Sequence, residues 1–202
     1  MSVPDFSRLT ADNIVAFLGD IFARRGAESY LGERVTMSEH MLQAALFAQA
    51  AGASEELVVA ALLHDIGHYT NEFPEDALEK GTDTYHETAG AAVLSRFFPE
   101  VVVECVRQHV AAKRFLCAVD ADYFGRLSEA SVHTLALQGG PMSEEEARDF
   151  AKKRHAVDIV QVRIWDDEGK VPGLETPSFD DYAPMIGRVV AARGANLSGA
   201  HP

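Results

Sequence analysis

The chain has 202 residues, of which 47% are hydrophobic and 24% are charged, a balance typical of one globular domain with a sizeable core. Its net charge of −13 argues against nucleic-acid binding, because neutralising phosphates requires a basic surface. No run approaches the roughly 18 consecutive apolar residues of a membrane span, and the N-terminus lacks the features of a signal peptide, so we expect a cytoplasmic protein.

Helical patterns fill the chain, and strand-like alternation is nearly absent, so we predict an all-α fold. Helix starts are marked by Thr10 and Ser54 and by capping boxes at 84–87 and 143–146. Apolar residues at helical spacing follow each start. The patterns predict helices over about 10–26, 36–52, 54–65, 84–98, 99–110, 127–137, 143–165 and 179–193. We expect one domain over 1–202, with a folded core of about 8–193 and a C-terminal tail of 194–202.

Two connections matter for the site. Residues 71–83 are polar and predict a surface loop over it, and residues 169–177 predict a second loop. The Val101–Val103 run inside the fifth predicted helix would also suit a strand.

The segment His64-Asp65-Ile66-Gly67-His68 places adjacent neutral and anionic ligands after a long apolar run. Such nitrogen and oxygen donors suit Fe, Mn, Zn or Co, and the Asp of an adjacent His-Asp pair can bridge to a second metal. On a helix, His64 and His68 would share one face, since they are four residues apart. In isolation, the segment is equally compatible with a surface helix end that carries two histidines.

Further histidines make the metal interpretation stronger. His40, His86 and His109 lie on separate predicted helices, and each neutral imidazole needs its own partner if it is buried. The helix predicted over 143–165 adds Asp158. The clustering predicts these metal ligands: His40, His64, Asp65, His86, His109 and Asp158.

These residues resemble the H…HD…D signature of the HD-domain superfamily, whose members are all-helical, metal-dependent and mostly phosphohydrolases. The additional His86 and His109 are similar to the pattern of dinuclear members, among them the mixed-valent di-iron oxygenases such as myo-inositol oxygenase. The resemblance implies a single HD-domain helical bundle with a dinuclear metal site in its core.

Longer motifs look like the phosphonate-cleaving (PhnZ/TmpB-like) subgroup of these oxygenases. They are His64–Tyr69, His109–Arg114, Leu127–Ser131, Gln138–Met142 and Trp165–Lys170. This resemblance implies two iron ions, Fe(II)/Fe(III), and O2 as a co-substrate. One iron would be held by His40, His64, Asp65 and Asp158, and the other by His86 and His109, with Asp65 bridging. Tyr30 would close the second iron in the resting state, with Glu33 as its neighbour.

A phosphonate dianion needs donors and positive charge besides the metals. Lys113 lies one helical turn after His109, and His68 can donate to a bound oxygen. Without the resemblance, Lys113 would be interpreted as a solvated lysine. Glu33 would face a substrate ammonium group, with Tyr30 adding cation–π attraction. The substrate-binding candidates are Tyr30, Glu33, His68, Lys113, Ser131, Thr134 and His155, and the catalytic candidates among them are Tyr30, Glu33, His68 and Lys113.

The resemblance implies an oxygenase that cleaves the C–P bond of a (1-hydroxy-2-ammonioethyl)phosphonate. The acidic composition slightly favours the trimethylammonio substrate, which would give glycine betaine and phosphate, over the free amine, which would give glycine. A metal-dependent HD phosphohydrolase and a non-catalytic ligand-sensing HD module are the alternatives. The expected partner is a small organophosphonate, without nucleic acid or membrane, and the expected state is a monomer or weak homo-oligomer.

Overall fold

The computed structural model describes residues 6–30, 33–70 and 85–198. Those ranges contain helices and no β-strand, which confirms the predicted all-α class. The α-helices are α1 (Ile14–Arg25), α2 (Met37–Ala50), α3 (Glu55–Leu63), α4 (His86–Leu94), α5 (Glu100–Val119), α6 (Glu129–Leu137), α7 (Glu144–Ala151), α8 (Ala156–Glu168) and α9 (Phe179–Ser198), and the short 3-10 helices are η1 (Phe6–Arg8), η2 (Ile66–Tyr69) and η3 (Phe124–Arg126).

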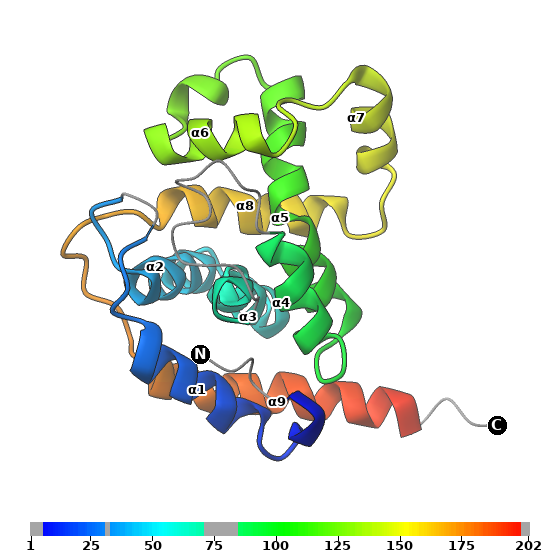
Figure 1. Ribbon diagram of the computed structural model, residues 1–202. Helices are drawn as coiled ribbons and strands as arrows, with labels where there is room; N and C mark the ends of the chain where they lie inside the picture. Colours follow the sequence, from blue (N-terminus) through cyan, green and yellow to red (C-terminus); the bar gives the residue numbers. More distant parts are fainter. Residues whose placement is uncertain (1–5, 31–32, 71–84, 199–202) are drawn as a thin grey trace.

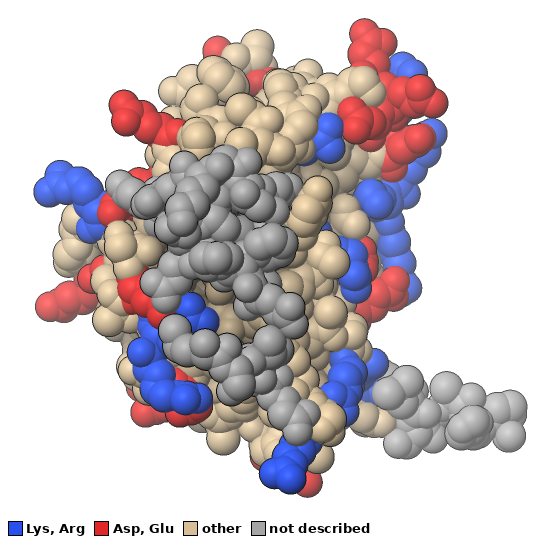
Figure 2. All heavy atoms as spheres, in the orientation of Figure 1, with Lys and Arg blue, Asp and Glu red and all other residues tan. Residues whose placement is uncertain are grey.

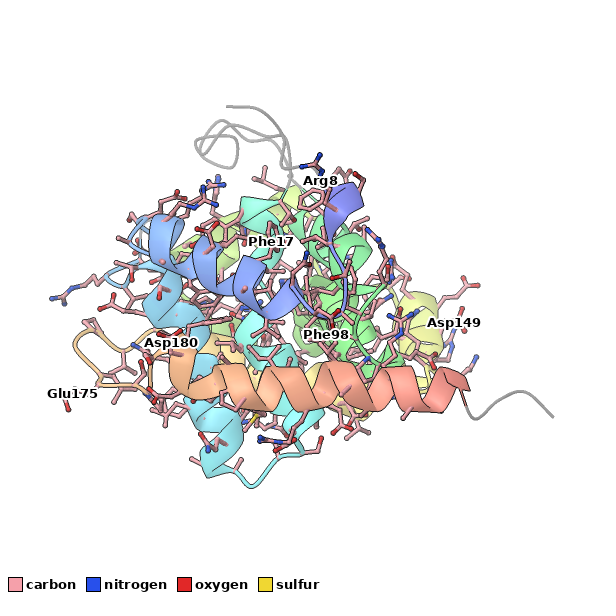
Figure 3. All side chains as sticks on the ribbon, turned by 90° about the horizontal axis from the view of Figure 1, so that it is seen from below. Arg8, Phe17, Phe98, Asp149, Glu175 and Asp180 are labelled. Atoms are coloured by element: carbon pink, nitrogen blue, oxygen red, sulfur yellow. The ribbon has the colours of Figure 1, made fainter. Side chains whose placement is uncertain are left out.

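The helices α2, α3, α5 and α8 pack against one another at the centre of the molecule (Figure 1). Helices α1 and α9 lie together beneath this centre, and α6 and α7 lie above it in the same view. Seen from below, α9 spans the face with α1 beside it (Figure 3). On the face shown in Figure 2, acidic and basic side chains are interspersed around the periphery, without one continuous acidic patch among the described residues.

Helix α3 is the most deeply buried element of the described chain, because its neighbours cover it on every side. Its residues Val58–Leu63 are at most 1% exposed. The Ser54 side chain accepts a hydrogen bond from the Leu57 N–H and thereby caps its start. The end of this apolar helix delivers His64 and Asp65 to the middle of the bundle.

Helix α3 ends two residues before its predicted end at Asp65, so His64 and His68 do not share a helix face. The helix ends at Leu63, and residues Ile66–Tyr69 form a separate 3-10 helix. Gly67 explains the tight packing of this 3-10 helix, because a Cβ there would lie 1.7 Å from the His86 carbonyl oxygen. The close approach brings the first residue of α4 beside Asp65.

The single long helix predicted over 143–165 is also wrong. Helix α7 ends at Ala151, and α8 begins at Ala156 after a turn. No glycine or proline marks this break in the sequence. Tertiary packing decides it: the Phe150 ring stacks on Phe115 of α5 with centroids 4.7 Å apart, while α8 turns away to pack along α2 and α5.

Other helix boundaries differ as well. Helix α5 is a helix throughout, not a strand at its valine run, and continues to Val119, past the predicted end at Val110. Helix α4 ends at Leu94 rather than Phe98, and it begins after Tyr85, which has a left-handed backbone. The predicted cap Thr84 and the loop 71–83 lie outside the described residues. Within the described ranges, no helix has both the length and the apolar character needed to cross a membrane.

Candidate metal centre and substrate pocket

Four side chains from three central elements converge at the end of α3. The Nε2 atoms of His40 and His64 are 3.0 Å apart. Asp65 Oδ2 lies 3.5 Å from the first and 3.4 Å from the second. Asp166 Oδ1 lies 3.4 Å and 3.7 Å from the same two nitrogens. Both carboxylate oxygens therefore lie within 4 Å of the same two nitrogens, as ligands of a single metal ion would.

The other oxygen of Asp65 belongs to a second group. Asp65 Oδ1 is 3.2 Å from His86 Nε2 and 3.3 Å from His109 Nε2. Those two nitrogens are 3.0 Å from each other. One carboxylate therefore offers one oxygen to each group, as a bridging ligand between two metal ions would.

Hydrogen bonds on the far side of three of the four rings orient these histidines, whereas His86 Nδ1 has no hydrogen-bond partner. His40 Nδ1 donates to the Gly169 carbonyl at 2.9 Å. His64 and His109 donate in the same way to the carbonyls of Ala61 and Val106, each at 2.8 Å. Because a carbonyl only accepts, Nδ1 of these three rings carries a proton, and Nε2 is the atom directed at the centre.

This arrangement fits bound cations better than an apolar core. The Nε2 atoms of His40 and His64 face each other across 3.0 Å, and those of His86 and His109 do the same. Asp166 Oδ1 is buried and has no hydrogen-bond partner. Buried acceptors that face one another are unstable unless a positive charge lies between them. The donor set of imidazoles and carboxylates suits iron, manganese, zinc or cobalt.

The carboxylates dominate the local electrostatics. Burial opposes a charge on His64, but Asp65 and Asp166 outweigh it and raise the pKa of His64 to about 9. Burial also opposes ionisation of Asp65, yet the surrounding histidines hold its pKa well below the usual value. The site therefore keeps its carboxylates ionised and attracts positive charge.

The structure does not place Asp158 with the predicted ligands, and Asp166 takes its position. Asp158 lies in the first turn of α8, where its nearest polar neighbour is His155 Nδ1 at 3.4 Å. Asp166 lies eight residues later, about 12 Å along the helix axis. Only that end of α8 reaches His40, through the Gly169 carbonyl. The assignment of Asp158 as a ligand is therefore corrected to Asp166.

A pocket adjoins the second group of histidines. Its lining includes His86, His109 and Asp166, so a bound molecule can reach the candidate metal centre. Predicted substrate residues also line it, namely Tyr30, Glu33, Lys113, Ser131 and Thr134. Helix α6 contributes the last two hydroxyls of this set, and Lys113 comes from α5.

The pocket holds two lysines that donate to α6. Lys113 Nζ lies 2.8 Å from Thr134 Oγ1, and Lys170 Nζ lies 3.0 Å from Ser131 Oγ. Burial, together with the nearby Arg163 charge, lowers the pKa of Lys113 to about 7. Two ammonium groups and two hydroxyls on one side of a pocket form a site for an oxyanion.

Tyr30 and Glu33 supply a different chemistry. The Tyr30 ring stacks on His40 with centroids 3.9 Å apart, and the Lys170 ammonium lies 6.0 Å from its centroid. Burial, Asp65 and Asp166 raise the pKa of the Tyr30 hydroxyl, so it stays protonated. Glu33 Oε1 is buried without a hydrogen-bond partner. An unpaired carboxylate oxygen beside an aromatic ring suits a cationic group of a ligand.

Two predicted substrate residues lie outside the pocket lining. His68 stacks on His86 with centroids 4.0 Å apart, and its Nε2 is 3.9 Å from Asp65 Oδ1. His68 therefore lies beside the second group of histidines. It does not share a helix face with His64, because α3 ends at Leu63. His155 lies at the start of α8 beside Asp158, and the structure does not bring it to the pocket.

Sequence reasoning missed four polar residues of the pocket lining: Gln138, Arg163, Asp166 and Lys170. Gln138, Asp166 and Lys170 lie within the motifs Gln138–Met142 and Trp165–Lys170 that support the family resemblance. The sequence therefore indicates that these positions matter but does not indicate their roles. Arg163 has no such signal, because a lone arginine in a helix usually faces solvent.

Comparison with known proteins agrees with this geometry. Residues 37–147 match the family model described as HD domain. The chain is 55% identical, over 94% of its length and 97% of the relative's, to [1-hydroxy-2-(trimethylamino)ethyl]phosphonate dioxygenase (glycine-betaine-forming) of Leisingera caerulea. It is 44% identical, over 77% of its length and 78% of the relative's, to hydroxymethylphosphonate dioxygenase of Gimesia maris. An uncharacterized mimivirus protein, L432, is 32% identical over 83% of this chain and 77% of its own. The predicted resemblance is confirmed.

Proposed function

The chain belongs to the HD-domain family, and from that premise we propose that it is a di-iron, O2-dependent oxygenase of organophosphonates. The proposed substrate is 1-hydroxy-2-(trimethylammonio)ethylphosphonate, and the products are glycine betaine and inorganic phosphate. The observation that carries the proposal is the pocket that joins an oxyanion site, an unpaired carboxylate and the second group of histidines. The similarity to two phosphonate dioxygenases supports it.

The proposed reaction balances with O2 as the only oxidant. The C–P bond breaks, C1 becomes a carboxylate carbon, and the phosphonate leaves as hydrogen phosphate with release of one proton. Carbon and phosphorus together lose four electrons, and one O2 molecule accepts all four. Two iron ions held by these residues would supply Lewis acidity toward the C1 hydroxyl and the redox chemistry with O2.

The side chains of the pocket account for binding and orientation. Lys113, Lys170, Ser131 and Thr134 would hold the phosphonate oxygens, and this would direct C1 toward His86 and His109. Glu33 would face the trimethylammonio group at the other end. The proposal keeps the expectation of a cytoplasmic chain that acts alone or as a weak homo-oligomer.

An assay of phosphate release with and without O2 tests the proposal. We expect the iron-loaded chain to form phosphate and glycine betaine in air and neither product under argon. A metal-dependent phosphohydrolase would be indifferent to O2 and would act on phosphate esters. Equal phosphate release in both atmospheres would therefore overturn the oxygenase proposal in favour of hydrolysis.

Glu33→Gln should separate substrates by charge. We expect kcat/KM for the trimethylammonio substrate to fall by about 10- to 100-fold, because a partly buried cation loses about 1.5–3 kcal/mol of charge pairing. Hydroxymethylphosphonate carries no cation, so its kcat/KM should change little. Glu144→Gln, at a 95% exposed carboxylate, is the matched control. Equal losses for both substrates would show that Glu33 does not bind the cation.

Lys113→Met should weaken substrate binding and yet stabilise the metal-free protein. The folded chain binds the Lys113 proton less tightly than the unfolded chain, since its pKa falls from 10.5 to about 7. This penalty is complete below pH 7 and disappears as the pH rises toward 10.5. We expect a gain of about 2–4 kcal/mol in unfolding free energy at pH 6 and almost none at pH 10.5.

Denaturant unfolding at the two pH values, with KM measured beside it, checks this prediction. The exposed Lys152→Met is the control and should change neither quantity appreciably. A Lys113→Met chain that is less stable than the wild type at pH 6 would contradict it.

A further inference from the structure

The two oxygens of Asp166 lie in different surroundings. Oδ1 faces His40 and His64 and has no hydrogen-bond partner. Oδ2 accepts a hydrogen bond of 2.7 Å from Arg163 Nη1. Since Asp166 is 2% exposed and Arg163 is 4% exposed, water cannot replace this pairing. The arginine therefore determines which oxygen points toward the candidate metal.

Arg163 is itself fixed by a second set of contacts. Its Nε donates to Asp167 Oδ2 at 3.0 Å and to the Tyr123 hydroxyl at 3.1 Å. Its Nη2 is paired with Asp167 Oδ1, and the Tyr123 hydroxyl also donates to Asp167. Tyr123 is buried and comes from the segment between α5 and η3, so it ties the α8 arginine to a distant part of the chain.

The shape of the guanidinium is essential to this arrangement. It is planar and presents its N–H groups in a fixed fork, so it can bond Asp166 on one edge and Asp167 on another at the same time. A lysine ammonium carries the same charge but acts as a point donor on a flexible stem. With lysine, the Asp166 carboxylate would be free to turn about its terminal bond.

We propose that Arg163 is a positioning residue for the first metal ion of the centre. It holds Oδ2 of Asp166 so that Oδ1 alone is directed at the point shared with His40 and His64. Asp167 and Tyr123 keep the arginine in place. This assignment rests on the dinuclear centre of the proposed function, but it concerns metal affinity and not the reaction that the centre performs.

The assignment predicts a selective loss at one of two sites. In Arg163→Lys, we expect the affinity of the first site to fall by about 10- to 100-fold, as for other residues that orient metal ligands. The site of His86 and His109 should keep its affinity, because the hydrogen bonds of Arg163 go to Asp166, Asp167 and Tyr123. Tyr123→Phe removes one hydroxyl and should give a smaller loss at the same site.

Anaerobic titration of the metal-free full chain with Co(II), followed by its visible absorption, tests this directly. The wild type should bind two equivalents, and Arg163→Lys should bind one tightly and one weakly, with an altered spectrum for the weak site. Arg188→Lys, in an exposed ion pair with Glu55, is the matched control and should match the wild type. Thermal unfolding of each metal-free variant establishes that it is folded.

Two results would overturn the assignment: two wild-type affinities in Arg163→Lys, or equal weakening at both sites. If Arg163→Lys folds poorly, Tyr123→Phe replaces it in the same comparison, because this substitution keeps every charge. The titration requires no turnover. A wild-type chain that binds two Co(II) ions, but whose iron-loaded form releases no phosphate, would therefore contradict the proposed function while the affinity series still supports Arg163.

Discussion

Asp166→Ala should reduce phosphate release by more than about 100-fold, whereas Asp158→Ala should leave it within about twofold of the wild type. Both aspartates lie on α8, but only Asp166 comes within 4 Å of His40 and His64. Its removal deletes one candidate ligand and leaves Arg163 Nη1 without its Asp166 partner, although Asp167 still pairs with the guanidinium. Asp158 is half-buried beside His155, so its removal costs little.

The two variants control for each other, because each removes one carboxylate from the same helix. Metal content by atomic absorption should fall by one equivalent in Asp166→Ala only, with both chains remaining helical by circular dichroism. An inactive Asp158→Ala together with an active Asp166→Ala would restore the assignment made from the sequence and refute the one made from the structure.

Asp65→Asn should abolish activity and weaken both metal sites together. Asparagine keeps the shape of the side chain but removes the charge, and it offers one oxygen where the carboxylate offers two. Since Asp65 Oδ2 faces His40 and His64 while Oδ1 faces His86 and His109, one substitution acts on both groups. We expect each affinity to fall by at least about 100-fold.

Anaerobic metal titration distinguishes the loss of a ligand shared by both metal sites from the loss of a ligand that belongs to one site only. His86→Ala is the comparison, because it should weaken the second site and leave the first intact. If Asp65→Asn lost only one equivalent and kept the other at wild-type affinity, the carboxylate would not be shared. The metals would then occupy independent sites.

Much of the site was predictable from residue types alone. His40, His64, Asp65, His86 and His109 converge as expected, because buried histidines on separate helices have few other ways to be satisfied. The anion-binding role predicted for Lys113 also has a structural counterpart, since the side chain lines the pocket and donates to Thr134.

The helical spacing alone could not decide between Asp158 and Asp166. Both lie in a helix whose apolar stripe is compatible with either end meeting the core. The crossing of α8 over α2 decides it, since it brings the Gly169 carbonyl to His40 Nδ1. That crossing follows the break between α7 and α8, beside which Phe150 stacks on Phe115, and no glycine or proline signals this break.

The position of His68 was missed for a related reason. A spacing of four residues implies a shared face only if the helix continues, and α3 ends at Leu63. The close contact of Gly67 with the His86 carbonyl is a long-range feature that a local pattern does not reveal.

A crystal structure of the iron-loaded chain, with anomalous scattering measured at the iron edge, would test the dinuclear centre most directly. We predict two anomalous peaks per chain. One should lie among His40, His64 and Asp166 and the other beside His86 and His109, with one oxygen of Asp65 directed at each. A single peak, or a peak bound by Asp158 in place of Asp166, would contradict this account.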